Sequence, residues 1–153
     1  MALKLDLCGI QLEFAINNYK PSTEHDRFAT WCDVEFCISS ADWLNYRIEG
    51  ELLMNDEVLE ILSRIDDILN CDVGDPNVWE CMEPDFKFTF YPKNDRTKDP
   101  KYLYVRPGCE IEDIRLEWSV YFWDGRLSGN RITLVLSREN IVELRQYLAS
   151  VVF

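Results

Sequence analysis

The sequence holds few of the side chains on which covalent or acid–base catalysis depends. Its single histidine, His25, lies in the polar run Ser22-Thr23-Glu24-His25-Asp26. A Ser/His/Asp or Cys/His mechanism would need this residue as its base, whereas a lone histidine between acids on a loop is usually only solvated. No G-x-S-x-G nucleophile elbow or glycine-rich phosphate loop occurs among the six glycines. The sequence therefore predicts a protein without a catalytic site.

Carboxylates are the remaining chemical candidates. Glu110, Glu112 and Asp113, or Asp33 and Glu35, could supply the acid pair of a glycosidase, but on strands they are more simply the solvated face. The segment from Asp72 to Asn77 offers three oxygen-bearing side chains that could attract a hard cation, yet it lacks the spacing and the final glutamate of a calcium loop. We interpret it as a helix-terminating turn. No metal and no cofactor are predicted.

Acidic residues are concentrated in one part of the chain. The net charge is −12, and residues 56–85 contain ten Asp or Glu against Arg64 alone, which gives 1 − 10 = −9. Nucleic-acid binding needs clustered Lys and Arg, so this distribution argues against it. It favours a basic protein partner, because complementary charge speeds encounter and rejects wrong partners. The alternative is that the acids only keep the protein soluble.

One segment opposes the general acidity. Residues 92–107 carry five Lys or Arg and two Asp, a net charge of +3, beside Tyr91, Tyr102 and Tyr104. Basic residues interleaved with aromatic ones could bind single-stranded nucleic acid. The preferred interpretation is a solvated hairpin tip with its tyrosines on the sheet.

The chain is expected to fold in the cytoplasm. Its 153 residues are 47% hydrophobic, which suffices for a packed core. The N-terminus does not resemble a signal peptide, and no window approaches a membrane span. The six cysteines show no C-x-x-C spacing and mostly lie in apolar-patterned segments, which suits reduced, buried thiols.

Hydrophobic periodicity predicts the elements that hold these residues. Alternation over residues 3–16, with a change of phase at Gly9, and over residues 28–39, 44–52, 86–90, 102–105, 114–122 and 132–136 predicts strands, with Trp118 in phase with the core. A 3.6-residue period predicts helices near residues 56–70 and after Ser137. Short connections favour antiparallel pairing, and residues 102–105 are expected to lead back from the charged turn at 94–100 as the partner strand of residues 86–90. The expected fold is a single α+β domain over residues 1–153, with a mainly antiparallel sheet that can curl strongly, one central helix and one C-terminal helix.

This order of elements resembles that of the WapI-like immunity proteins of bacteria. The matching pieces are the alternating N-terminal strands, the acidic helix from Asn55 to Asn70, the strand entry Glu83-Pro84-Asp85-Phe86-Lys87-Phe88-Thr89-Phe90, and Leu136-Ser137-Arg138-Glu139-Asn140, which opens the final helix. The resemblance implies a cytosolic antitoxin that binds and blocks the toxin domain of a contact-dependent system, often a nuclease. The alternative is a non-catalytic structural or regulatory module of a larger assembly.

If the resemblance holds, an acidic patch is the expected contact with a basic toxin domain. The candidate partner-binding residues are Asp66, Asp67, Asp72, Asp75, Glu80 and Trp79. Trp79 lies between acidic turns, and tryptophan is the residue type most often found as an interface anchor. The alternative for Trp79 is a lid over the edge of the core.

Overall fold

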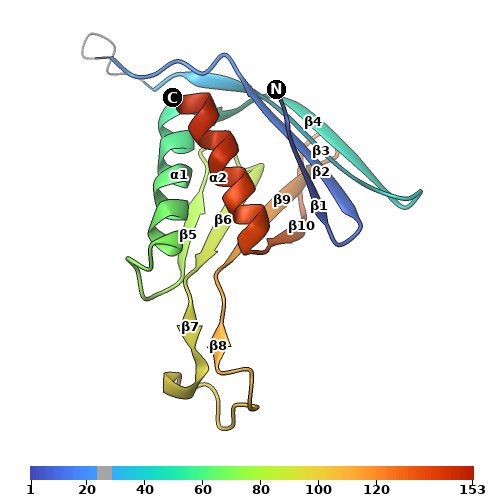
Figure 1. Cartoon of the computed structure of the whole chain (residues 1–153). Helices are drawn as coiled ribbons and strands as arrows, with labels where there is room; N and C mark the ends of the chain where they lie inside the picture. The colour runs from blue at the N-terminus through green and yellow to red at the C-terminus, as the bar shows by residue number, and fades with distance from the viewer. Residues whose placement is uncertain (24–28) are drawn as a thin grey trace.

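The computed structural model describes residues 1–23 and 29–153, so His25 lies outside the described residues. The first half of the chain forms an antiparallel sheet with strand order β1-β2-β3-β4 (Figure 1). Its strands are β1 (Leu3–Leu7), β2 (Ile10–Asn17), β3 (Trp31–Ser40) and β4 (Leu44–Met54). Cys8 and Gly9, both at positive φ, make the first turn, as the change of phase at Gly9 indicates.

A second antiparallel sheet has strand order β10-β9-β6-β5. Its strands are β5 (Asn77–Glu80), β6 (Phe86–Tyr91), β9 (Arg115–Trp123) and β10 (Leu127–Leu136). The prediction that residues 102–105 pair with β6 is wrong, because β6 pairs with β9, with Phe88 opposite Trp118. β9 alternates over a longer stretch and buries Leu116, Trp118 and Val120, whereas residues 102–105 lie between Pro100 and Pro107 and offer a weaker apolar face.

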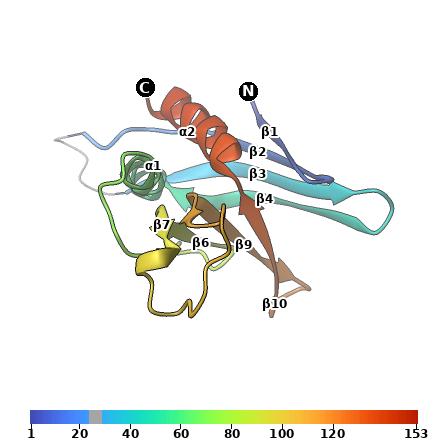
Figure 2. The same cartoon turned by 60° about the horizontal axis from the view of Figure 1, so that its bottom comes forward.

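Two helices complete the body, α1 (Asn55–Leu69) and α2 (Arg138–Val152). They lie side by side and contact each other (Figure 1). α1 also contacts β4 and β6, while α2 contacts β1, β9 and β10. Figure 2 shows the same elements turned by 60°. The apolar stripe predicted for α1 is buried, as are Ile141, Leu144 and Leu148 of α2. The predicted α+β class with antiparallel strands and two helices is confirmed. The strands form two four-stranded sheets and a two-stranded ribbon.

Aromatic rings join the two sheets. Trp118 of β9 is fully buried, with its ring centroid 5.0 Å from Phe14 of β2 and 5.3 Å from Phe36 of β3. Phe86 of β6 lies 5.2 Å from Phe36. One buried cluster includes residues of both sheets and both helices. The core phase predicted for Trp118 is confirmed.

Residues 92–113 form an arm that projects from the body between β6 and β9 (Figure 1). Within it, β7 (Asn94–Asp95) pairs with β8 (Ile111–Glu112), and a 3₁₀ turn covers Arg96–Lys98. Tyr102 and Tyr104 lie on this arm and are exposed. The expectation of tyrosines on the sheet is therefore wrong for these two and right for Tyr91, the last residue of β6. The segment has too few apolar residues to enter the core and folds around Arg96 instead.

Cysteine placement departs in part from the prediction. Cys32 and Cys81 are buried free thiols, and Cys37 is half-buried. Burial raises the pKa of the Cys32 thiol to about 11. Cys8, Cys71 and Cys109 are exposed, because each lies in a turn or in the arm. No helix in the described part of the chain is long and apolar enough to cross a membrane.

Candidate partner-binding surface

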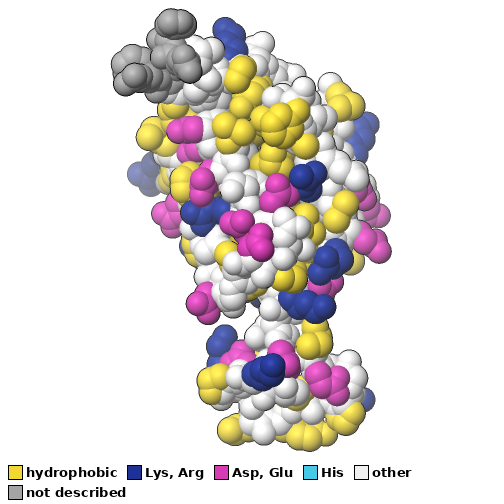
Figure 3. Space-filling view, turned by 60° about the vertical axis from the view of Figure 1, so that its left-hand side comes forward, with side chains coloured by type: hydrophobic (Ala, Val, Ile, Leu, Met, Phe, Trp, Pro, Cys, Tyr) yellow, Lys and Arg dark blue, Asp and Glu magenta, His cyan; other side chains and the backbone are white. Residues whose placement is uncertain are grey.

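The predicted acidic patch begins on the solvent side of α1. Burial of Ile61, Ile65 and Ile68 fixes the rotation of this helix and leaves Asp66 and Asp67 half-buried at its flank. Figure 3 shows this side of the molecule, where acidic side chains lie among basic ones above the projecting arm. The patch is therefore a mixed surface, although residues 56–85 contain only one basic residue.

Asp66 is balanced by a residue far away in the sequence. Arg145 of α2 donates from Nε to Asp66 Oδ1 at 2.6 Å. This hydrogen bond and the aspartate charge raise the pKa of the Arg145 guanidinium. An acid near the C-terminal end of a helix is disfavoured by the helix dipole, and the ion pair with Arg145 compensates for that placement.

The chain turns sharply after α1 and exposes two further acids. Asp72 N–H donates to the carbonyl of Asp67 at 2.9 Å, and Cys71 takes a positive φ of 59°. These features end the helix, and the interpretation of residues 72–77 as a helix-terminating turn is confirmed. Asp72 and Asp75 are exposed on this turn. The carboxylates of Asp67, Asp72 and Asp75 form no ion pair or hydrogen bond with another described residue.

Arg64 lines a hollow between α1 and this turn. The hollow has a volume of about 440 Å³ and is lined by Glu60, Arg64 and Asp67 of α1 and by residues 73–77. Arg64 donates to Glu60 Oε1 at 2.7 Å and to Asn77 Oδ1 at 2.6 Å. These bonds hold the one basic side chain of residues 56–85 against the helix, and Arg64 forms no ion pair with Asp67 or Asp75.

Trp79 and Glu80 lie on β5, at the edge of the second sheet. The Trp79 ring is half-buried, packs against the core and lies 4.9 Å beneath the Arg64 guanidinium carbon. Its Nε1 is buried and finds no acceptor among the described residues. Glu80 is exposed, with its carboxylate 3.9 Å from Lys87 Nζ. The Trp79 ring thus packs against the Arg64 guanidinium, and the nearest basic group to the Glu80 carboxylate is Lys87 at the long distance of 3.9 Å.

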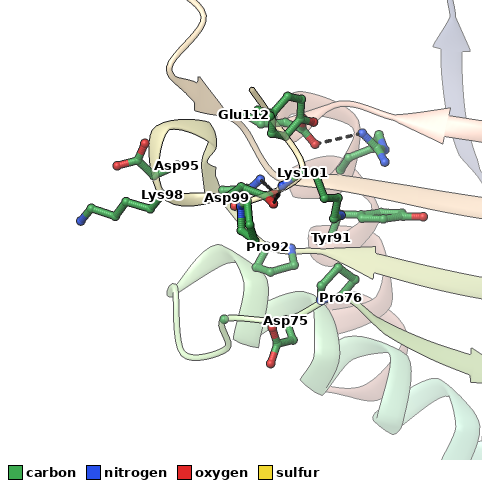
Figure 4. Close-up of a pocket in the computed structure, with 14 residues that line it drawn as sticks. Asp75, Pro76, Tyr91, Pro92, Asp95, Lys98, Asp99, Lys101 and Glu112 are labelled. Carbon is green, nitrogen blue, oxygen red and sulfur yellow. Dashed lines mark hydrogen bonds and ion pairs between the residues drawn. The ribbon is translucent and has the colours of Figure 1, made fainter. Parts of the chain in front are cut away.

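A cleft of about 630 Å³ separates the acidic turn from the arm. Gly74, Asp75 and Pro76 line it from the turn. The arm contributes residues with charges of both signs, among them Lys98, Asp99 and Lys101. Figure 4 shows Asp75 and Pro76 on the turn and Asp95, Lys98 and Asp99 on the arm. The turn therefore contributes one charged residue, Asp75, and the arm contributes both basic and acidic ones.

The other carboxylates considered from the sequence have structural partners. Glu112 accepts from Arg96 Nη2 at 2.7 Å, and Asp113 accepts from Arg138 Nη2 at 2.7 Å. These hydrogen bonds lower the pKa values of both acids. Asp33 accepts from Asn18 Nδ2, and Glu35 lies 4.0 Å from Arg47. Across residues 1–23 and 29–153, no three His, Cys, Asp or Glu side chains come together as a metal site.

Sequence reasoning did not identify the arm as a projecting element. Its signal was present, because Pro100 and Pro107 bracket the tyrosines and disfavour a ladder strand there. Trp43 was also not singled out as exposed, yet it is 68% exposed at the β3–β4 connection. Trp123 is partly exposed and donates from Nε1 to the buried Asp85.

Comparison with known families covers nearly the whole chain. The model of the immunity protein WapI-like family matches residues 5–152. No curated protein shows significant similarity to the chain. The family match includes both sheets, both helices and the arm.

Proposed function

Because the chain belongs to the WapI-like family of immunity proteins, we propose that it binds a cognate toxin domain in the cytoplasm and neutralises it. The match over residues 5–152 is the observation that carries this proposal. Neutralisation by binding needs shape and charge complementarity and no reactive group on the immunity protein. The proposed contact is the acidic patch, made of Asp66, Asp67, Asp72, Asp75, Glu80 and Trp79.

Within this patch, the free charges are the best candidates for direct contact. Asp67, Asp72 and Asp75 lie around one turn, and their carboxylates make no ion pair with another described residue. Their desolvation by a partner would not require breaking an internal bond. Asp66 already neutralises Arg145, so its contribution is expected to be smaller. Trp79 would contribute by holding Arg64 in place.

A basic partner surface fits these free acids, and a nuclease is the toxin class whose active site is basic. Nucleases bind phosphate backbones through Lys and Arg. An acidic protein surface can occupy such a site and exclude the nucleic acid. The proposed mechanism is therefore steric and electrostatic blockade. Binding should weaken as salt concentration rises, because exposed charges are screened.

The experiment uses the purified full chain and the C-terminal domain of the protein encoded by the gene directly upstream, which the proposal takes as the cognate toxin domain. Calorimetry compares the wild type with a triple variant carrying Asp67→Lys, Asp72→Lys and Asp75→Lys. The triple variant is expected to lose on the order of 100-fold or more in affinity, because like charges then face each other across the contact. A matched control carries Asp42→Lys, Glu51→Lys and Asp124→Lys, which are exposed on other surfaces.

The control changes the net charge by the same amount and should bind within severalfold of the wild type. Equal losses in the two variants would show that only net charge matters and would contradict the assignment of the patch. Failure of the wild type to bind the toxin would contradict the immunity function itself. An interaction module unrelated to toxins would give that result.

A further inference from the structure

Two carboxylates of the arm accept hydrogen bonds from the arm itself. Asp95 Oδ1 accepts from Thr97 N–H at 3.0 Å and from Thr97 Oγ1 at 2.6 Å. Asp99 accepts from Lys101 N–H at 3.0 Å and from Asn94 Nδ2 at 3.1 Å. These hydrogen bonds brace the arm, and the donors are all neutral groups of the arm itself.

Arg96 is the basic residue that belongs to this framework. It donates from Nε and Nη2 to Glu112 at 3.0 and 2.7 Å, and from Nη1 to the Cys109 carbonyl at 3.2 Å. Its guanidinium carbon lies 5.5 Å from the centre of the Tyr102 ring. These contacts tie the outgoing and returning halves of the arm together, so that the tip is held in one shape before any partner arrives.

The remaining basic residues of the arm point to solvent. Lys98, Lys101 and Arg106 are exposed, and none is within 4.0 Å of a carboxylate oxygen in the described chain. Arg106 and Lys101 lie within residues 100–107, a stretch that contains no acid. The end of the arm is therefore a basic surface on a protein whose net charge is −12.

Large apolar side chains occupy the same tip. Leu103 is fully exposed, and Tyr104 is 76% exposed. Tyr102 and Ile111 are also exposed beside them. Hydrophobic side chains appear at the end of the arm in Figure 3. Burying a leucine and a tyrosine in a partner's recess removes this apolar area from water, and tyrosine is enriched among residues that dominate binding energy.

We propose that the tip of the arm is a second docking element, which inserts Leu103 and Tyr104 into an apolar recess of the toxin domain bordered by carboxylates. This inference rests on the proposed immunity function. The rim is assigned as acidic because Lys98, Lys101 and Arg106 offer unpaired positive charge around the apolar pair. The tip thus contacts a part of the toxin opposite in charge to the part that meets Asp67, Asp72 and Asp75.

The cleft explains why both contacts would belong to one partner. Asp75 lines it from the turn, and Lys98 and Lys101 line it from the arm. A partner lying across the cleft meets the unpaired carboxylate of Asp75 on one side and the unpaired ammonium groups of Lys98 and Lys101 on the other, so a surface with the reverse arrangement of charges fits it best. Such a pattern rejects proteins that are uniformly basic, which the acidic patch alone would attract.

Single-stranded nucleic acid is a less suitable occupant of the tip. Three free cations on a chain of net charge −12 provide little neutralisation of a phosphate backbone. A second copy of the chain is another possible occupant, since its acidic patch would face the basic tip. Both are included as outcomes of the test.

The experiment measures binding of the full chain to the upstream-encoded toxin domain by surface plasmon resonance. The tip variant carries Leu103→Ser and Tyr104→Ser, and it is expected to bind roughly 30-fold or more weakly, mainly through faster dissociation. A charge variant with Lys98→Glu, Lys101→Glu and Arg106→Glu should bind roughly 10-fold or more weakly, mainly through slower association. The controls are Trp43→Ser and Arg126→Glu, exposed residues on other turns, which should bind within twofold of the wild type.

Thermal unfolding checks that the tip variants fold. We expect them to unfold at the temperature of the wild type, because the substituted side chains are exposed to solvent. This inference would be overturned if both tip variants bound the toxin with unchanged affinity while the charge reversal at Asp67, Asp72 and Asp75 still weakened binding. The proposed function would then remain intact. Absence of wild-type binding would overturn both. Two further results would overturn the inference if the tip variants kept their affinity for the toxin. One is a fluorescent single-stranded oligonucleotide that binds the wild type and not the tip variants. The other is a dimer, seen by sedimentation, that the wild type forms and the tip variants do not.

Discussion

Arg145 and Asp66 form an ion pair between the two helices, with Nε and Oδ1 2.6 Å apart. The pair joins α2 to α1 near the C-terminal end of α1, where an acid would otherwise oppose the helix dipole. It removes one charge from the acidic patch. The placement of Asp66, which in the sequence suggests a functional role, has a structural reason.

Asp66 should therefore differ from its neighbours when its charge is removed. Asp66→Asn is expected to leave toxin affinity within about threefold of the wild type, because an exposed pair contributes little and its carboxylate is already used. Asp72→Asn should weaken binding more, since it removes a free charge. Calorimetry on the two single variants makes the comparison. An equal or greater loss in Asp66→Asn would mean that the toxin displaces Arg145.

Glu57 is expected to be a structural residue of the acidic segment. It is 5% exposed, and its two carboxylate oxygens accept from Met54 N–H at 2.9 Å and Met82 N–H at 2.6 Å. Glu57→Ala should lower the free energy of unfolding by about 1–3 kcal/mol, because two backbone donors lose their acceptor. Denaturant titration measures this. Asp56→Ala, an exposed change one residue earlier, is the control and should cost less than about 1 kcal/mol.

Asp85 should give the stability a recognisable dependence on pH. Burial raises the pKa of Asp85, and the Trp123 N–H only partly opposes this. Between the ordinary pKa and the raised one, the folded protein binds more protons than the unfolded chain. The contribution of Asp85 to the free energy of unfolding is thus greatest at low pH and falls as pH rises through the raised pKa.

The variant Asp85→Asn keeps an oxygen acceptor for Trp123 and cannot lose a proton. Its unfolding free energy, relative to the wild type, should increase as pH rises from about 4 to 7. Urea denaturation of both proteins at several pH values tests this. A constant difference across the range would show that Asp85 does not change its ionisation there.

Trp118 should be the most sensitive tryptophan of the chain. It is fully buried and contacts rings from both sheets. Trp118→Ala is expected to lower the free energy of unfolding by about 3–5 kcal/mol, because the cavity would separate the two sheets. Trp43→Ala is the control at a side chain 68% exposed, and it should change stability by less than about 0.5 kcal/mol. Similar effects in both variants would contradict the assigned core.

Much of the architecture could be predicted from local pattern, because each strand and helix shows its buried face in its own sequence. The alternation around Trp118 and the helical stripe around Ile65 both predict the correct burial. The partner of a strand could not be predicted from local pattern, since pairing depends on which distant segment offers the better apolar face. For that reason β6 was predicted to pair with residues 102–105 and pairs instead with β9.

The sequence by itself determined that the chain contains one histidine and that its acids are concentrated in residues 56–85, because residue types and counts do not depend on folding. Only the tertiary structure decided which charges are free. Arg145, which lies 79 residues further along the chain, pairs with Asp66. In the arm, Asp95 and Asp99 accept hydrogen bonds from neighbouring residues, while Lys98 and Lys101 are exposed and form no ion pair with a described residue. Ion pairing depends on distance in space, and that distance is set by how α1, α2 and the arm pack.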